Sequence, residues 1–297
     1  MKYSLSKEEL KNDLLYDTLK ALTSSLQEID IPLYVVGATA RDIMMKLLDE
    51  DEVRRRTNDL DVAIALKDWS DYDMVQNKLE SNHFIKEKDK QKFYYKGVDG
   101  KNDFEVDVVP FGGVAQDEQI CWPPEGNPVM SVKCFEDVMA CSLTVSIDNN
   151  ITFQIAPLCG QFLIKLDTWI DRHAKTNKDA VDMYYFLTKY FTTMVMNGAT
   201  PPDEINLSDD KEDIELDILS ARWLALDIAK LLSDEHLKYY ITIIHDELSK
   251  EEDSALFYQF MTNFSDDKED KYEASFNIWS AIKDFFGKEL ETRNHEN

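Results

Sequence analysis

The stretch that decides the fold is "TNDLDVAIAL", residues 57–66, in which an apolar run begins around two aspartates. Successive side chains of a β-strand point to opposite faces, so Asp59 and Asp61 are expected side by side on one face. Two carboxylates that close repel each other unless a positive charge lies between them. A divalent cation is the usual partner, and oxygen ligands suit magnesium. The alternative is a pair of solvated carboxylates at a strand end.

The composition is that of a folded protein. The chain has 297 residues, of which 43% are hydrophobic and 31% charged, enough for one large or two modest domains. The four cysteines form no C-x-x-C pair, so we expect reduced thiols and no zinc site. No apolar run reaches the roughly 18 residues of a membrane helix, and the N-terminal stretch lacks the apolar region of a signal peptide. We therefore expect a cytoplasmic protein without a membrane partner.

The net charge of −25, of which residues 201–297 contribute −15, repels nucleic acid at long range. Any nucleic-acid contact would therefore need a local basic patch in the first 200 residues. The candidates are Arg54, Arg55 and Arg56, the run Lys86, Lys88, Lys90 and Lys92, and the set Lys165, Arg172, Lys175 and Lys178. Lysines at every second position of one strand would line one of its faces, although a solvated face is the alternative.

The apolar periodicity divides the chain near Pro157. Before it, helices are predicted over 7–29 and 69–79, and a strand, a glycine turn and a helix in "PLYVVGATARDIMMKLL" (32–48). Strands are predicted over 59–66, within 83–97 and 103–113, and as a hairpin within 139–157. After it, helices are predicted over 158–172, 177–194, 213–233, 235–249, 253–263 and 272–290. The pattern indicates an α+β or α/β unit followed by a helical unit.

Two further segments carry chemistry. Gly37 follows a strand and precedes a helix, where a glycine lets the backbone turn tightly and the helix N-terminus offers N–H groups to phosphate. The helix after it would bring the 59–66 strand alongside. "DFEVDVVPFGG" (103–113) adds Glu105 and Asp107 on one face of another strand. Three carboxylates around a glycine turn are what two-metal phosphoryl transfer requires.

The ordered set "GATARD", "NDLDVAI" and "EVDVVPFGG" resembles the minimal nucleotidyltransferase (polymerase-beta-like) superfamily. Its pattern is a Gly-Gly or Gly-Ser turn, then D-x-D, then a third Asp on a later strand. Within it, the chain most resembles the AbiEii-like abortive-infection nucleotidyltransferase toxins and related bacterial predicted nucleotidyltransferases. Those also carry Lys and Arg on a downstream helix and a Lys-Asp pair that opens another helix. The matching residues, within a resemblance that covers 30–190, are Lys165, Arg172, Lys178, Asp179 and Asp182.

The resemblance implies an α+β fold with a nucleotidyltransferase-type mixed β-sheet flanked by helices, followed by a C-terminal helical bundle. Residues 1–156 would form the catalytic domain with its N-terminal helix, and residues 157–297 the helical domain. Asp59, Asp61 and Asp107 would bind metal. Asp107 is also the candidate base, chosen over Glu105 because it is in register with the third aspartate of the family.

The other implied roles concern the nucleotide. Gly37, Ala38, Thr39 and Arg41 would lie at the phosphates, and Lys165 and Lys178 would touch the triphosphate or the acceptor. Asp179 would either touch substrate or orient Lys178, and Arg41 has the alternative of an ion pair with Asp42 or another neighbour. The family usually has Gly or Ser where this chain has Ala38, so Thr39 or backbone N–H groups must serve the phosphates in its place.

The implied reaction transfers a nucleoside monophosphate from an NTP to a hydroxyl acceptor and releases pyrophosphate. The cofactor would be Mg2+, with Mn2+ as an alternative. The acceptor would be an RNA 3′ end such as that of tRNA, a protein side chain or a small molecule. A toxin-antitoxin or phage-defence role, with an antitoxin as partner, is also implied. The net charge disfavours a large RNA footprint.

Two other functions compete with this one. The first is a small-molecule nucleotidyltransferase of the antibiotic-modifying type, whose acid-rich C-terminal part would line a pocket for an aminoglycoside-like cation. The second is a non-catalytic nucleotide-binding module. The third carboxylate argues against the second function, because a binding module has no need of a base.

Overall fold

The computed structural model describes residues 2–47, 59–97, 103–206, 215–265 and 270–296. The chain divides into two compact units, Met1–Pro157 and Leu158–Asn297. The candidate basic residues Arg54, Arg55 and Arg56 lie outside the described residues. Across the part of the chain that is described, none of the helices combines the length and apolar character needed to cross a bilayer.

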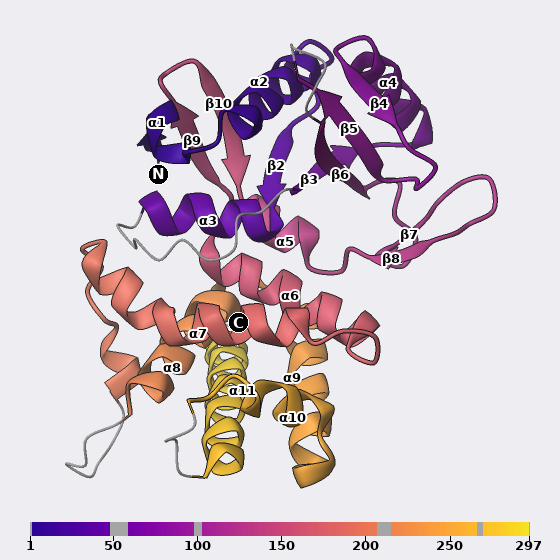
Figure 1. The fold of residues 1–297 in the computed structure, drawn as a ribbon. Coiled ribbons are helices and arrows are strands. Elements are labelled where there is room, and N and C mark those ends of the chain that lie inside the picture. The colour runs from indigo at the N-terminus through magenta and orange to yellow at the C-terminus, as the bar shows by residue number, and fades with distance from the viewer. Residues whose placement is uncertain (1, 48–58, 98–102, 207–214, 266–269, 297) are drawn as a thin grey trace. The chain divides into compact units, whose positions relative to one another are not determined.

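The first unit is built on a mixed β-sheet (Figure 1). Its described strands lie in the order β1-β9-β10-β2-β3-β6-β5-β4. Their bounds are β1 (Lys2–Leu5), β2 (Leu33–Val36), β3 (Asp59–Leu66), β4 (Phe84–Lys86), β5 (Lys92–Lys96), β6 (Asp103–Gly112), β9 (Leu143–Ile147) and β10 (Ile151–Ile155). A separate ribbon joins β7 (Gln119–Cys121) to β8 (Val129–Ser131). β1 and the β7–β8 ribbon were not predicted from the sequence.

Parallel and antiparallel pairs occur in the same sheet. β3 pairs parallel with β6 and antiparallel with β2, and β5 pairs antiparallel with β6 and β4. The predicted fold class is confirmed, since a mixed sheet is flanked by helices and followed by a helical C-terminal region. The order of the central strands places the start of β3 beside the end of β2 and the first half of β6.

Helices cover both faces of this sheet (Figure 1). They are α1 (Lys7–Leu10), α2 (Asp13–Gln27), α3 (Gly37–Leu47), α4 (Trp69–Glu80) and α5 (Phe135–Ala140). α2 and α4 lie on one face, where the Lys86 ammonium lies near the Tyr72 ring of α4, at 5.5 Å from its centre, and the Phe93 ring of β5. α3 follows β2 onto the other face, and there Phe135 of α5 meets Phe111 of β6 at 5.9 Å between ring centroids.

The helix predicted over 7–29 is in fact two helices. Lys11 takes a left-handed conformation (φ 52°) that ends α1, and the side chain of Asn12 caps α2 by accepting from the Leu15 backbone N–H. The interruption lets α2 turn its apolar stripe onto the sheet, where Leu19 and Leu22 are fully buried. A capping side chain that accepts an early N–H group compensates for the broken helical hydrogen bonds.

The lysine run 86–92 does not lie on one strand, contrary to the sequence-based expectation. Lys86 ends β4 and Lys92 begins β5, with a turn between them. The Lys86 ammonium lies 4.1 Å from the centre of the Phe93 ring, on the face covered by α4. Lys92 is the neighbour of Phe93 in the strand and therefore points to the opposite face.

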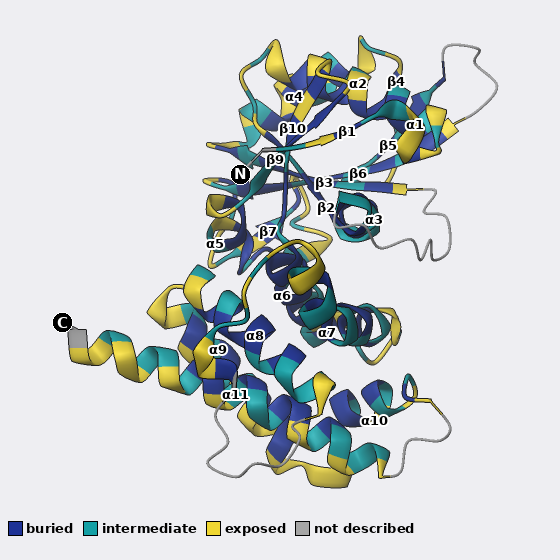
Figure 2. Cartoon of the chain, turned by 90° about the vertical axis from the view of Figure 1, so that its left-hand side faces the viewer, coloured by how far each residue is buried: buried dark blue, intermediate teal, exposed yellow. Residues whose placement is uncertain are grey.

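The second unit consists of helices in its described part. They are α6 (Leu158–Arg172), α7 (Lys178–Met196), α8 (Leu216–Leu231), α9 (Asp234–Ser249), α10 (Ala255–Met261) and α11 (Lys271–Glu296), with 3-10 turns η1 (Asp203–Asn206) and η2 (Glu251–Asp253). Trp279, Tyr240, Phe257 and Phe286 are fully buried in its core. Figure 2 shows the buried residues on the inner sides of these helices and the exposed ones on their outer turns. The helical periodicity predicted each of these helices, although α11 extends further than expected.

Candidate active site

The candidate site is a row of residues across four neighbouring strands. Val36 at the end of β2 is the direct partner of Asp61 in β3, Asp61 is the partner of Asp107 in β6, and Asp107 is the partner of Lys92 in β5. Directly paired residues point to the same face of a sheet. The side chains of Asp61, Asp107 and Lys92 therefore share one face, on which strands lie about 4.8 Å apart.

The next row repeats the arrangement two residues away. Asp59 of β3 is the partner of Glu105 in β6, which is the partner of Tyr94 in β5. The opposite face of β3 carries Leu60, Val62 and Ile64, all fully buried. The alternation in "DLDVAIAL" thus separates an apolar face that packs in the core from a face that presents carboxylates. Sequence reasoning brought Asp59, Asp61, Glu105 and Asp107 to one sheet face, and the register places them there.

The turn after β2 is shaped around Asp61. Gly37, the first residue of α3, has φ +67°, a backbone conformation that residues other than glycine rarely adopt. A Cβ atom on residue 37 would lie 2.1 Å from Oδ2 of Asp61. Glycine is therefore required here for two reasons: the backbone conformation is left-handed, and the Asp61 carboxylate leaves no space for a Cβ atom.

Thr39 fixes the start of β3. Its side chain is buried, and its hydroxyl donates to the backbone carbonyl of Asp59 at 2.9 Å. The proton of the Thr39 hydroxyl is thus used within the protein. With Ala38 contributing no polar side chain, the backbone N–H groups in the first turn of α3 are the donors suited to phosphate.

Arg41 takes the structural alternative. It is 8% exposed, and its Nε and Nη2 atoms donate to Oδ1 of Asp42 at 3.0 and 2.9 Å. A guanidinium held in this way contributes to the packing of α3. A direct contact of Arg41 with a nucleotide stays a prediction.

Glu105 and Asp107 differ in their partners. Glu105 accepts from the Tyr94 hydroxyl at 2.8 Å and forms an ion pair with Lys92, which holds the pKa of Glu105 below its usual range. Asp107 has a buried Oδ1 atom without a hydrogen-bond partner among the described residues. Burial raises the pKa of Asp107, although the Lys92 charge opposes that rise. Buried acceptors without partners and perturbed carboxyls are features of functional sites.

The carboxylates of this face suit a hard divalent cation, because they are oxygen donors from neighbouring strands and Asp107 has an unused acceptor. The side chains do not converge on one point, since within the described ranges no three His, Cys, Asp or Glu side chains form a metal-binding group. The Asp61 carboxylate lies against Gly37, and Asp59 is exposed. Carboxylates alone repel one another, so convergence would require a cation's charge.

Four of the predicted residues of the second unit form an ion-pair cluster between α6 and α7. Asp179 is fully buried and accepts from Nε and Nη2 of Arg172 at 2.7 and 2.8 Å. Lys165 lies 2.8 Å from Asp182 and 3.6 Å from Asp179. Lys178 is the exposed first residue of α7. Asp179 therefore orients Arg172 and Lys165. One of the two sequence-based expectations was that it would orient Lys178.

Sequence reasoning did not assign Lys92 and Tyr94 to the site. Lys92 entered only as part of a basic run, and Tyr94 was not singled out. The alternation in "KFYYK" (92–96) was the available signal, because it predicts that residues 92, 94 and 96 share a face. It could not indicate that this face carries Asp107, which depends on the pairing of β5 with β6.

No protein-family model matches the chain, and a search of curated proteins gives no match. Among solved structures, the chain is similar to JHP933 from Helicobacter pylori, with 17% identity, 98% of this chain and 97% of that chain covered, and a TM-score of 0.33. It is also similar to a CCA-adding enzyme in complex with ATP, with 10% identity, 91% of this chain and 68% of that chain covered, and a TM-score of 0.28. Both scores are low, so the functional argument rests on the geometry of the site.

Proposed function

We propose that the chain is a metal-dependent nucleotidyltransferase that transfers a nucleoside monophosphate from an NTP to a hydroxyl acceptor. The observation that carries this proposal is the buried Oδ1 of Asp107, which has no hydrogen-bond partner among the described residues and lies on the strand directly beside Asp61. A structural carboxylate would have its acceptors satisfied, as Glu105 does. Asp107 is therefore kept available for a proton or a ligand.

Different residues would bind the phosphates, hold the metal and accept the proton. The first turn of α3, opened by Gly37, receives the phosphates, and Asp59, Asp61 and Asp107 would hold Mg2+ or Mn2+. When bound, the cation neutralises charge on the triphosphate and on the leaving pyrophosphate. The acceptor oxygen forms a bond to the α-phosphorus while the bond to the bridging oxygen breaks, and pyrophosphate leaves with that electron pair. The acceptor proton passes to the Asp107 carboxylate.

The antibiotic-modifying alternative requires an acidic pocket. A cavity of about 300 Å3 lies between α8 and α11 in the second unit. Its charged lining residues are Arg222, Lys288 and Asp284, so two cations face one carboxylate. A polycationic drug would be repelled there. This cavity therefore gives no support to the small-molecule alternative.

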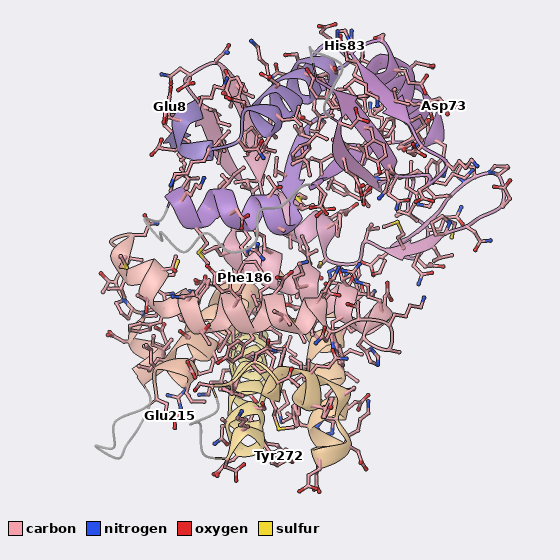
Figure 3. All side chains as sticks on the ribbon, viewed as in Figure 1. Glu8, Asp73, His83, Phe186, Glu215 and Tyr272 are labelled. Carbon is pink, nitrogen blue, oxygen red and sulfur yellow. The ribbon has the colours of Figure 1, made fainter. Side chains whose placement is uncertain are left out.

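A label-transfer assay tests the proposed function. Purified protein is incubated with each α-labelled NTP, Mg2+ and total cellular RNA and protein, beside the variants Asp59→Ala/Asp61→Ala and Asp107→Asn. The matched control is Asp73→Ala, which removes an exposed carboxylate from α4 on the opposite face of the sheet (Figure 3). We expect label on one acceptor with wild type and the control, and none with the site variants.

The same variants test the finer parts of the proposal. If the chain acts as a toxin, its expression arrests growth and the Asp107→Asn variant does not. Label that persists in Asp107→Asn would remove Asp107 from the chemistry. The absence of label from any NTP, with no shift of the melting temperature by Mg2+ and NTP, would contradict the nucleotidyltransferase function as a whole.

A further inference from the structure

The cavity between α8 and α11 combines apolar walls with two cations. Ile218 and Arg222 are four residues apart on α8, so their side chains share one face of that helix. α11 contributes residues 281, 284, 285 and 288, whose spacing likewise gathers them on one face. At about 300 Å3, the cavity is at the lower end of the range for pockets that hold small molecules. Its lining includes the apolar Ile218, Ala281 and Phe285 and the charged Arg222, Asp284 and Lys288.

Neutral groups orient the two cations. Nη1 of Arg222 donates to the backbone carbonyl of Ile205 at 2.9 Å. The Lys288 ammonium lies 4.7 Å from the centre of the Phe285 ring, and Phe285 itself is 4% exposed. Neither cation forms an ion pair with a carboxylate of the described residues. A carbonyl and an aromatic ring attract a cation but leave its positive charge in place.

The charge of the cavity contrasts with that of the unit around it. Residues 201–297 carry a net charge of −15. Other cations of the second unit are paired with carboxylates, as Arg172, Lys250 and Arg293 are. Asp284 lies four residues before Lys288, a spacing that permits an ion pair, yet its carboxylate pairs with the neighbouring lysine at 3.9 Å instead. The cavity is therefore a positively charged place in an acidic unit, and its complement is an anion.

We propose that this cavity binds a small organic molecule with one carboxylate and an apolar body. Because Ile205 uses one N–H group of Arg222, the guanidinium is held in place and its other N–H groups can meet a carboxylate in a bidentate geometry. The Lys288 ammonium would add a second positive charge. The apolar body would lie against Ile218 and Phe285 and displace water from them. This binding uses none of the groups of the proposed reaction, so it does not rest on the nucleotidyltransferase function.

The charges of the lining select the class of anion. Two cations and the Asp284 carboxylate leave one positive charge in excess, which a single carboxylate balances. A phosphate monoester carries a charge of about −1.5 to −2 at neutral pH, so its second charge would be repelled by Asp284. A nucleoside triphosphate is disfavoured more strongly for the same reason. The ligand of this cavity is therefore of a different class from the nucleotide of the proposed reaction.

Calorimetric titration of the full chain at neutral pH, without NTP or metal, tests the site. The probe is 2-naphthoate, which joins one carboxylate to an aromatic body. We expect saturable binding with a dissociation constant of about 1 mM or below, a range that ligands of this size reach. Neutral 2-naphthol and dianionic 2-naphthyl phosphate share the same body. Each should bind at least roughly 5-fold more weakly, because the first lacks the charge-assisted contact and the second is repelled.

Variants of the charged lining test which groups hold the carboxylate. Arg222→Gln should weaken naphthoate binding roughly 5- to 30-fold, because a charge-assisted hydrogen bond is lost. Lys288→Met should weaken binding roughly 2- to 5-fold, since this ammonium is exposed. Asp284→Asn should strengthen binding by a similar factor, because it removes a repelling carboxylate, and a misfolded protein would not show such a gain. The matched control is Lys238→Met, which removes an exposed lysine of α9 outside the cavity and should leave binding unchanged.

The outcomes separate this site from the proposed reaction. A wild type that does not bind naphthoate overturns the proposal. Equal binding by wild type, Arg222→Gln and Lys288→Met, or equal binding of naphthoate and naphthol, also overturns it. If Arg222→Gln lowers the melting temperature, Lys288→Met and Asp284→Asn decide the result. Tighter binding of naphthyl phosphate than of naphthoate overturns the assignment to a carboxylate. Naphthoate binding that depends on the cations supports the site, whether or not the protein transfers label from an NTP.

Discussion

The carboxylate of Asp61 lies against the α-carbon of Gly37, so close that a Cβ on residue 37 would be 2.1 Å from Oδ2. The relationship joins two segments that come from neighbouring strands, the turn after β2 and the start of β3. It makes the glycine turn and the first carboxylates one structural feature. The geometry of the site should therefore be sensitive to a single methyl group at residue 37.

We expect Gly37→Ala to destabilise the first unit by more than its backbone strain. A left-handed residue other than glycine costs about 1–2 kcal/mol, and the clash with Asp61 adds to this. The matched control is Gly126→Ala, which has φ +74° but no atom within 4 Å of the added Cβ. Urea unfolding measures both variants.

A double-mutant cycle isolates the clash. In an Asp61→Ala background, the cost of Gly37→Ala should fall toward that of Gly126→Ala, because the Oδ2 and Cγ atoms at 2.1 and 2.8 Å are gone and only the Cβ at 2.9 Å remains. Additive costs of the two changes would show that Asp61 and Gly37 are not coupled.

Asp107→Asn should abolish label transfer. The free energy of unfolding of this variant, relative to that of wild type, should also increase as the pH rises. Burial raises the pKa of Asp107, so folding favours its protonated form. That stabilisation is complete below the unfolded pKa of about 3.9 and is lost as the pH rises through the folded pKa. Urea unfolding of both proteins between about pH 4 and 7 checks the trend. The prediction would be contradicted if Asp107→Asn were less stable than wild type at neutral pH but not in acid.

Glu105→Gln should show the opposite dependence on pH. Lys92 and Tyr94 hold the pKa of Glu105 below its usual range, so the ionised form contributes stability above the unfolded pKa of about 4.3. This contribution is lost as the pH falls through the folded pKa. We expect a cost of up to about 1 kcal/mol at neutral pH, because the Lys92 and Glu105 side chains remain 22% and 29% exposed, and none in acid. Denaturant titrations beside Asp107→Asn make the comparison direct.

Asp179→Asn should destabilise the second unit by about 2–4 kcal/mol, because it leaves Arg172 and Lys165 without their buried carboxylate. The value lies toward the lower end for a buried pair, since the Arg172 side chain is 46% exposed. Lys178→Ala removes an exposed cation at the start of the same helix and should change stability little. Thermal melting compares the two variants. Equal melting temperatures would contradict the positioning role of Asp179.

Lys86→Met should be more stable than wild type at neutral pH, with the advantage declining in base. Burial against Tyr72 and Phe93 lowers the pKa of Lys86 to about 8. The unfolded chain therefore binds more protons between the folded pKa and about 10.4, and wild-type stability rises over that window. Lys88→Met, at an exposed residue of the same turn, is the control for the loss of a charge. Melting temperatures that change with pH in parallel for all three proteins would contradict the lowered pKa of Lys86.

The sequence predicted the elements on which the site is built. Alternating residues in β3 distinguish a core face from a carboxylate face, and this pattern is local. Gly37 marks a turn because its position between a strand and a helix is also visible locally. The helices of the second unit follow from apolar residues at helical spacing. Lys11 and Asn12 escaped notice because a single left-handed residue can split a helix without disturbing its apolar stripe.

By itself the sequence determined the strands around the site, the helices of the second unit and the face on which each carboxylate lies, because these depend on the periodicity of neighbouring residues. Only the tertiary structure distinguished the two carboxylates of β6, since the register of β5 and β6 gives Glu105 its partners, whereas Oδ1 of Asp107 has none among the described residues. The tertiary structure likewise placed Lys86 and Lys92 on opposite faces of the sheet and paired Asp179 with Arg172. Pairing between strands and between helices involves residues far apart in the chain, so no local pattern specifies it.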